Sequence, residues 1–450
     1  MKQCFLTLCL CVGACQAAAF DTPSVDGIWE TDGYGMILEI AGDRARVYST
    51  GPDFCIAESD GMTPITEVLP GITFTLSGHG QMLNLAFWHD PHRIAARRLH
   101  GLPPSCAVHM PTDPATVFDA FVGYFDAHYP FFPLYDVDWS ARVAEARTLV
   151  GADTSDRALF DVLAWLISPI RDSHVSLVAE IDGVRHVAAP GRARIVQHLR
   201  DDADAAGADP DRAAHAFRDA LWYDSIQKDI LQGRGQMIGQ DRIQYGMLTR
   251  DIGYLAFATL GGFDPADDLQ MAQILLDEII AYFTARRAST LLLDLSVNSG
   301  GSDIVAREVA RRFVRTPTFA YTKRAADAAR PIETRVVIDP NTDARFNGAV
   351  IVLTSHVTVS AAEILTLALR PQPHVTHVGE TTRGALSDAV SRSLPNGWQL
   401  SLSNELYLDA DGHRWEGRGI PPHVALPVLT DETPIESHRQ VIEVLRGNTP

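Results

Sequence analysis

Ser360 stands where a polypeptide chain can make a hydroxyl group nucleophilic. The apolar run 349–353 predicts a strand, and residues 354–370 (TSHVTVSAAEILTLALR) predict a short turn and then a helix that begins at Ser360. At a helix N-terminus, free backbone N–H groups and the positive end of the helix dipole converge. Such a serine suits nucleophilic attack, although serines also cap helices without doing any chemistry.

A glycine-rich turn supplies candidate donors for an oxyanion. Residues 298–302 (NSGGS) follow the apolar run 290–295 and precede a second predicted helix. Two glycines let the backbone turn tightly and approach a substrate. The N–H of Gly300, together with that of Ala361, would form an oxyanion hole beside Ser360. An ordinary strand-to-helix turn is the alternative, and a phosphate-binding loop is disfavoured because no GxxxxGK[ST] pattern follows.

A nucleophilic serine needs a base, and the chain has 16 histidines. His174 stands out because residues 172–177 (DSHVSL) form a polar turn that opens an extended segment after a buried helix. His356, just before Ser360, is a rival by proximity alone. Each of the other histidines, taken singly, is more often a surface or core residue. Imidazole titrates near neutral pH, so it can accept the serine proton and return it to a leaving amine.

The elements around these residues alternate between strands and helices. Strands are predicted at residues 252–257, 290–295, 349–353 and 375–378, and helices at 266–287, 302–313 and 360–370. This alternation predicts an α/β core, a sheet with covering helices. Both candidate segments follow the C-terminal ends of strands, the sheet edge that ligand sites favour.

Earlier regions have a different organisation. Short apolar stretches between Gly- and Asp-rich turns predict an N-terminal all-β domain, a small barrel or sandwich. An aromatic stripe at helical spacing then predicts a helical subdomain. The expected division is a signal peptide at 1–19, the β-domain at 24–110, the helical subdomain at 111–177, a lid or cap at 178–248, the catalytic core at 249–430 and a C-terminal tail or helix at 431–450.

Composition limits the possible partners. The formal net charge is −18, which disfavours nucleic acids and anionic membrane surfaces, since both attract clustered Lys and Arg. No interior apolar stretch approaches the roughly 20 residues of a membrane-spanning helix. Residues 1–19 combine one positive charge, an apolar run and small residues before Phe20. This pattern predicts a signal peptide cleaved after Ala19 and export to a bacterial periplasm or the exterior.

The cysteines agree with export. Four of the six lie in or beside the N-terminal segment, where residues 12–15 (VGAC) weakly resemble a lipoprotein box that would lipidate Cys15. Cys55 and Cys106 are left after cleavage, and an exported protein commonly pairs two such cysteines. We therefore predict a disulfide between them. Two buried thiols are the alternative, and a metal site is improbable because neither has a CxxC or CxxH neighbour.

Four segments, in one order, resemble the core of peptidase family S41, which includes the C-terminal processing proteases and the tricorn core protease. They are residues 290–302 (TLLLDLSVNSGGS), 349–370, 378–384 (VGETTRG) and 415–424 (WEGRGIPPHV). The resemblance covers roughly residues 113–177 and 250–427. It implies a mixed α/β sheet with covering helices, of the ClpP/crotonase type. It also implies Ser360 as nucleophile and the N–H groups of Gly300 and Ala361 as oxyanion hole.

The family has two catalytic designs. The processing proteases pair their serine with a lysine 25 residues later, but this chain has Ala385 there. Arg383 cannot replace that lysine, because a guanidinium group is not deprotonated at usable pH. The tricorn design uses histidine, and by resemblance it assigns His174 as general base. Ser173 and Glu416 would orient it, with Glu416 acting through Ser173.

Two departures from the family are visible. The tricorn protease has an aspartate directly after its nucleophile, where this chain has Ala361. Processing proteases carry a PDZ domain near the position of residues 178–248, but no Gly-Leu-Gly-Phe-like loop occurs there. A lid or cap is expected instead, and recognition of free C-termini is unsupported.

The resemblance implies an exported serine peptidase that cleaves a peptide or protein through an acyl-enzyme and needs no metal or organic cofactor. A non-catalytic protein of the same fold that binds a hydrophobic ligand or a peptide is one alternative, and an esterase-like hydrolase is another. The feature that discriminates between catalysis and binding is whether Ser360, His174 and Glu416 converge within hydrogen-bond reach.

Overall fold

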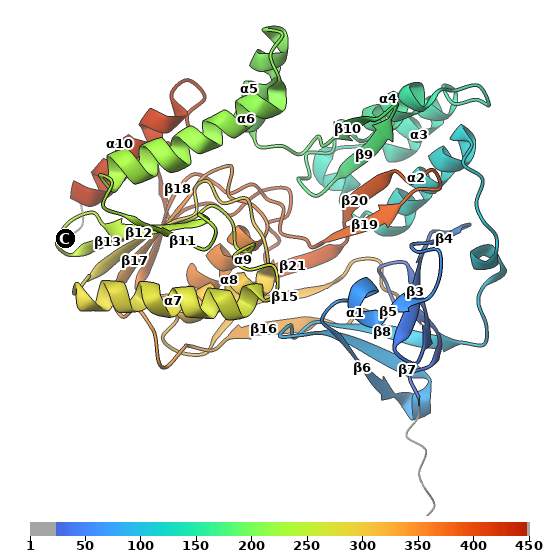
Figure 1. Ribbon diagram of the computed structural model, residues 1–450, viewed down its shortest axis with the longest axis horizontal. Helices are drawn as coiled ribbons and strands as arrows, with labels where there is room; N and C mark the ends of the chain where they lie inside the picture. The colour runs from blue at the N-terminus through green and yellow to red at the C-terminus, as the bar shows by residue number, and fades with distance from the viewer. Residues whose placement is uncertain (1–23, 448–450) are drawn as a thin grey trace, which may run out of the picture.

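The computed structural model describes residues 24–447, and Figure 1 shows how its helices and sheets are arranged. The predicted signal peptide of residues 1–19, including Cys15, lies outside this range. Within it the chain forms an antiparallel sheet, then a group of helices, then a larger α/β core, which confirms the predicted fold class. No helix of residues 24–447 has the length and apolar character needed to cross a membrane.

The N-terminal domain is one eight-stranded sheet whose neighbouring strands are all antiparallel. Its order is β4-β3-β2-β1-β8-β7-β6, with β5 beside β3. The strands are β1 (Gly27–Thr31), β2 (Met36–Ala41), β3 (Arg44–Thr50), β4 (Cys55–Ala57), β5 (Thr63–Pro64), β6 (Ile72–Ser77), β7 (Met82–Phe87) and β8 (Arg93–Leu99). The short helices are α1 (Ile65–Val68), η1 (Gly78–Gly80) and η2 (Pro104–Ala107). The predicted disulfide between Cys55 and Cys106 is present and ties β4 to η2.

Three helices follow: α2 (Pro114–His128), α3 (Trp139–Arg147) and α4 (Asp156–Ile167), with the 3-10 turn η3 (Phe132–Tyr135) between the first two. Each α-helix begins after a residue whose side chain accepts a backbone N–H, as N-cap residues do. The predicted aromatic stripe of α2 is buried in the core that these helices share. This core packs against a four-stranded sheet of order β10-β9-β20-β19. Its strands are β9 (Ser176–Ile181), β10 (Val184–Ala188), β19 (Ala389–Ser393) and β20 (Gln399–Ser403).

The α/β core is built on a seven-stranded sheet of order β11-β12-β13-β14-β17-β18-β22. Its strands are β11 (Gln236–Ile238), β12 (Ile243–Met247), β13 (Ile252–Phe257), β14 (Thr290–Asp294), β17 (Ala349–Thr354), β18 (Val375–Gly379) and β22 (Val424–Ala425). The four predicted core strands are the central, parallel ones. Strands β11 and β12 come from the segment expected to be a lid, because a short turn after Met247 folds β12 back onto β13. The sheet thus extends past the expected boundary at residue 249.

Helices cover both faces of this sheet because successive strand residues point to opposite sides. One core contains Leu255, Leu291 and Leu293. It is covered by α7 (Asp268–Ala285), α8 (Asp303–Arg311) and α9 (Ala361–Leu369). The opposite core contains Tyr254 and Leu292. It is covered by the π-helix η4 (Ala220–Ile230) and by α10 (Pro434–Gly447).

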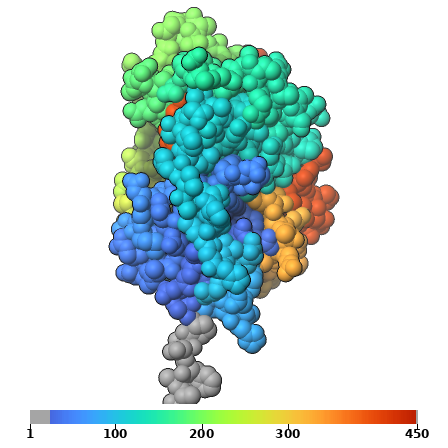
Figure 2. All heavy atoms as spheres, turned by 90° about the vertical axis from the view of Figure 1, so that its right-hand side faces the viewer, coloured from blue at the N-terminus to red at the C-terminus, as the bar shows by residue number. Residues whose placement is uncertain are grey.

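Two further parts complete the molecule. Helices α5 (Arg194–Ala205) and α6 (Pro210–Asp219) form a hairpin at the top of Figure 1. A three-stranded sheet of order β16-β15-β21 has the strands β15 (Thr318–Ala325), β16 (Thr334–Ile338) and β21 (Glu405–Asp409). In Figure 1 it lies between the α/β core and the N-terminal domain. Figure 2 shows the N-terminal domain and the helical subdomain adjoining on one surface.

Candidate active site

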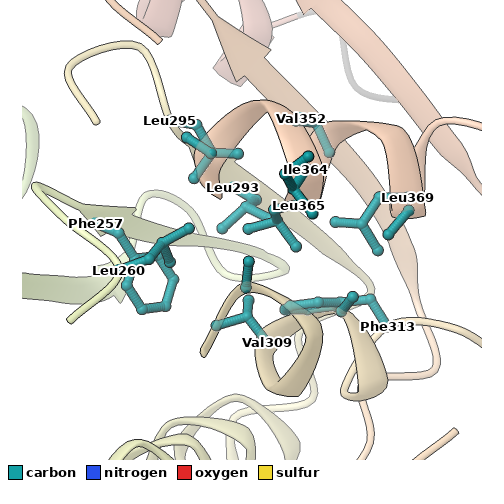
Figure 3. Packing of buried hydrophobic residues seen from close by; sticks show 14 of the residues in the cluster. Phe257, Leu260, Leu293, Leu295, Val309, Phe313, Val352, Ile364, Leu365 and Leu369 are labelled. Atoms are coloured by element: carbon teal, nitrogen blue, oxygen red, sulfur yellow. The ribbon is translucent and has the colours of Figure 1, made fainter. Parts of the chain in front are cut away.

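Helix α9 fixes the position of Ser360 through its packing. Every residue of Ala361–Leu369 is buried, so this helix is enclosed on all sides. Figure 3 shows Ile364 and Leu365 pointing toward Leu293 of β14, with Val309 of α8 on the other side. A helix held this way presents its first turn, and the residue before it, at a defined place.

Ser360 itself has a strained backbone conformation. Its φ is 57° and its ψ is −126°, outside the regions that residues with a Cβ atom favour. Such a conformation costs on the order of 1–3 kcal/mol and persists only where its surroundings impose it. The backbone N–H of Ser360 donates to the carbonyl of Ala385 (3.0 Å) and to Oε2 of Glu363 (3.1 Å). Strain of this kind is typical of functional sites.

The structure brings His174 to Ser360, from 186 residues away along the chain. Nε2 of His174 lies 3.2 Å from Oγ of Ser360, within the hydrogen-bond reach that a general base requires. His174 lies in the turn between α4 and β9, as its predicted place in a polar turn implied. Its side chain is 17% exposed, so a substrate and water can still reach the imidazole.

Asp172 is the carboxylate beside this imidazole, and the sequence reasoning overlooked it. Its Oδ1 accepts the backbone N–H of His174 (2.9 Å) and lies 4.0 Å from Nδ1 of the ring. Its Oδ2 accepts the hydroxyl of Tyr129 (3.1 Å), and the side chain is fully buried. No hydrogen bond joins the carboxylate to the imidazole, since Nδ1 of His174 has no partner among the described residues, but the carboxylate lies behind the imidazole as in serine-histidine-aspartate sites. The Asp-x-His spacing of residues 172–174 was the available signal.

The structure does not join Glu416 to His174 through Ser173, as the prediction expected. The backbone N–H groups of Leu386 and Ser387 each donate to Oε2 of Glu416 at 2.9 Å. Among the residues that the structure describes, neither oxygen of Glu416 bonds to Ser173 or His174. Burial, and then the charge of nearby carboxylates, raises the pKa of Glu416 well above its usual range. The carboxyl group of Glu416 thus holds the backbone of residues 386–387.

Ser173 also has other partners than those expected. Its hydroxyl donates to the carbonyl of Gly191 (2.7 Å) and accepts from Nε of Arg383 (3.0 Å). Its only hydrogen is thus used on Gly191, and among the described residues the hydroxyl forms no bond with the imidazole of His174. Ser173 instead belongs to the contacts around Gly191, which lies in the connection from β10 to α5.

The two predicted oxyanion donors are near Ser360 but differ in availability. Ala361 is the first residue of α9, and its N–H has no acceptor among the described residues. Gly300 has a φ of +87°, and an added Cβ there would lie 2.8 Å from Cβ of Ser360. Its N–H, however, donates to Oδ1 of Asn298 (2.8 Å). The N–H of Ala361 is thus unpaired among the described residues, whereas that of Gly300 is bonded to Asn298.

Glu363 is a second residue that the sequence reasoning missed. This fully buried carboxylate accepts four hydrogen bonds, from the backbone of Ser360, Gly384 and Ala385 and from the hydroxyl of Thr382. Burial raises its pKa, and these hydrogen bonds oppose the rise. The pattern Ser-x-x-Glu at residues 360–363 is the signature of a capping box, which was the signal that could have found it.

Ala385, at the position where the processing proteases have lysine, lies beside Ser360. Ala385 is buried, and its carbonyl accepts the backbone N–H of Ser360. Nδ1 of the rival base His356 donates instead to Oε2 of Glu380 (2.7 Å). As for metals, the described residues place the ligand atoms of Asp409, Asp411 and His413 within 4.8 Å of one another, outside this site. Such largely exposed acidic groups are common without a metal.

Comparisons with known proteins agree with this geometry. Residues 251–426 match the family model of peptidase family S41. A candidate peptidase from Parabacteroides merdae is similar in structure, with a TM-score of 0.60 at 24% identity, over 75% of this chain and 96% of that chain. Mature CPAF complexed with lactacystin has a TM-score of 0.54 at 13% identity, over 74% and 98%. Mature CPAF alone gives 0.51 at 12% identity, over 74% and 96%. These likenesses show the fold, and the family match shows that residues 251–426 are similar to peptidase family S41, a family of serine-type peptidases.

Proposed function

We propose that this protein hydrolyses peptide bonds through an acyl-enzyme on Ser360, with His174 as general base. The observation that carries the proposal is the contact of 3.2 Å between Nε2 of His174 and Oγ of Ser360. The strained backbone of Ser360 supports it, and so does the N–H of Ala361, which has no acceptor among the described residues. A peptide or protein is the substrate class that the family match supports.

The proposed reaction has two halves. His174 takes the proton of Ser360 as Oγ attacks the carbonyl carbon of the substrate, and the N–H of Ala361 stabilises the resulting oxyanion. The intermediate collapses to an acyl-enzyme as the imidazolium gives its proton to the leaving amine. A water molecule, deprotonated by His174, then releases the acyl group and restores the hydroxyl. The carboxylate of Asp172 favours the imidazolium in both halves.

This arrangement favours catalysis over the ligand-binding alternative, because a binding protein has no need of a base in contact with a strained serine. We infer further that the protein is exported, which the disulfide between Cys55 and Cys106 supports. We also propose that the hairpin of α5 and α6 caps the site, since the connection that leads into it contacts Ser173.

Hydrolysis of fluorescently labelled casein tests the function. We expect Ser360→Ala to abolish it and His174→Ala to lower it by about 100- to 10,000-fold. His356→Ala, which removes the rival base, serves as the matched control and should retain activity. A Ser360→Ala variant with wild-type activity would exclude the nucleophile assignment. Comparing amide with ester substrates of the same acyl group separates a peptidase from an esterase-like hydrolase.

A further inference from the structure

The serine and the histidine of the site come from different parts of the molecule. Ser360 belongs to the α/β core, whereas His174 belongs to the turn between the helical subdomain and β9. Their contact therefore depends on whatever joins these two parts next to the site. A shift of about 1 Å between reacting groups can cost about 100-fold in rate, so this junction matters for catalysis.

Arg383 spans the junction. Its backbone N–H donates to the carbonyl of Thr358 (2.8 Å), two residues before Ser360. Its guanidinium group reaches the other part: Nε donates to Oγ of Ser173 (3.0 Å) and to the carbonyl of Gly191 (3.1 Å). Nη2 donates to the carbonyls of Gly191 and Arg192. One residue thus bonds the serine segment with its backbone and the histidine segment with its side chain.

Gly191 connects Arg383 to the segment that carries His174, because it packs against the backbone of that segment. An added Cβ at Gly191 would lie 2.0 Å from the carbonyl oxygen of Asp172 and 2.4 Å from the backbone nitrogen of Ser173. Gly191 therefore stacks directly on the peptide bond that precedes Ser173 and His174. Fixing its carbonyl fixes the segment from which the imidazole projects.

We propose that Arg383 is a positioning residue that holds His174 against Ser360, an inference that rests on the proposed function of these two residues. A guanidinium group suits this task, because its planar fork reaches several carbonyl and hydroxyl oxygens at once in fixed directions. Lysine carries the same charge as a single point and cannot reproduce that fork. Arg383 lies two residues before the position where the processing proteases carry their lysine, but its role here is to place the base.

The test measures inactivation by a fluorophosphonate probe, separating the maximal rate kinact from the affinity KI. We expect Arg383→Ala to lower kinact by about 100-fold with KI little changed, since the base is misplaced while the binding surface is kept. Guanidinium chloride at millimolar concentration should restore part of kinact, because the free cation can occupy the vacated position. Arg383→Lys should fall between wild type and Arg383→Ala.

Arg142 offers a matched control. Its guanidinium group also bonds two carbonyls, of Trp165 and Leu166, and a serine hydroxyl, of Ser168, but within the helical subdomain. We expect Arg142→Ala to lower the melting temperature while kinact stays at the wild-type value and guanidinium has no effect on it.

Two results would overturn the proposal: a wild-type kinact in Arg383→Ala, or a loss that guanidinium does not restore at all. If Arg383→Ala does not fold, Arg383→Lys decides instead. A lower kinact at an unchanged melting temperature supports positioning, and a wild-type kinact contradicts it. Labelling of Ser360→Ala at the wild-type rate would instead exclude the proposed function, so the two failures are distinguishable.

Discussion

At the scale of single residues, the site depends on a serine held in a conformation that it would not adopt alone. The positive φ of Ser360 is stabilised by the carbonyl of Ala385, the carboxylate of Glu363 and the first turn of α9. His174 contacts the hydroxyl, and Asp172 lies behind the imidazole. These contacts assign distinct tasks to neighbouring side chains, and each task can be tested by a single substitution.

Replacing Asp172 tests the carboxylate behind the base. We expect Asp172→Asn to lower kcat for labelled casein by about 10- to 100-fold, because the imidazolium loses a nearby negative charge while the shape of the side chain is kept. KM should change little. Tyr129→Phe removes only the hydroxyl that bonds Asp172 and should have the smaller effect. A wild-type kcat in Asp172→Asn would contradict this assignment.

Replacing Glu416 separates the two roles considered for it. If its carboxyl group only holds residues 386–387, Glu416→Gln should lose less than about threefold in kcat. A residue that orients the base would lose far more, about 100-fold. Steady-state kinetics at neutral pH distinguishes these outcomes, and the larger loss would return Glu416 to the catalytic machinery.

The same residue predicts a dependence of stability on pH. Burial raises the pKa of Glu416 in the folded protein above its ordinary 4.5. In the unfolded chain the carboxyl ionises above that pH, so unfolding releases a proton and becomes easier as pH rises toward the folded-state pKa. Above about pH 5, the melting temperature of Glu416→Gln should fall less steeply with rising pH than that of the wild type. Parallel curves would contradict the raised pKa.

Sequence reasoning reached part of the site. Ser360 and His174 could be predicted because each lies in a local pattern, a strand-turn-helix and a polar turn, that a family resemblance joins. Asp172 was equally local but was passed over in favour of Glu416. The place of Glu416 could not be predicted, because its partners are backbone N–H groups of Leu386 and Ser387, which carry no sequence signal.

At the scale of elements, helix α9 connects the hydrophobic core to Ser360. It could be predicted because its apolar run follows a strand and ends before Pro371. Strands β20 and β21 could not, since they are short and pair with β9 and β15, which lie far away in the sequence. The pairing of β20 with β9 matters for the site, because β9 follows His174 directly. Part of the histidine's support thus comes from the C-terminal third of the chain.

Glu363 tests the connection between α9 and the segment 382–385. In Glu363→Gln an amide N–H₂ group faces N–H donors, and leaving buried donors without an acceptor costs about 1–3 kcal/mol. We expect slower probe labelling as well as a lower free energy of unfolding in urea. Thr366→Val serves as the control. It removes one hydroxyl, which bonds the carbonyl of Ala362 within the same helix. It should lower stability alone, and an equal labelling defect there would contradict a specific role for Glu363.

At the scale of the whole molecule, the N-terminal domain is joined to the core by buried polar contacts. The hydroxyl of Tyr34 donates to Glu405 (2.5 Å), and Nδ1 of His92 lies 2.9 Å from the hydroxyl of Thr334. Glu405 lies in β21 and Thr334 lies in β16, so the N-terminal domain packs on the three-stranded sheet. An N-terminal β-rich region followed by an α/β core could be predicted from composition and periodicity. Their docking could not, because it uses isolated polar residues distant in sequence.

The disulfide is expected to stabilise the N-terminal domain. Cys55 and Cys106 close a loop with a sequence separation of 51 residues. Removing the disulfide should lower the free energy of unfolding by about 4 kcal/mol, because the unfolded chain gains conformational freedom. We expect the Cys55→Ser/Cys106→Ser double variant to unfold at lower urea concentration, while wild-type protein treated with reductant shifts equally. Unchanged unfolding would show that the bond contributes nothing to the stability of the domain.

The central claim is that Ser360 is the nucleophile and that His174 activates it. Mass spectrometry of the protein after reaction with a fluorophosphonate probe tests it most directly, by locating the adduct among the proteolytic fragments. We predict a single adduct on Ser360, formed much more slowly in His174→Ala and absent in Ser360→Ala. An adduct on another residue, or labelling of Ser360 at an unchanged rate in His174→Ala, would contradict the account.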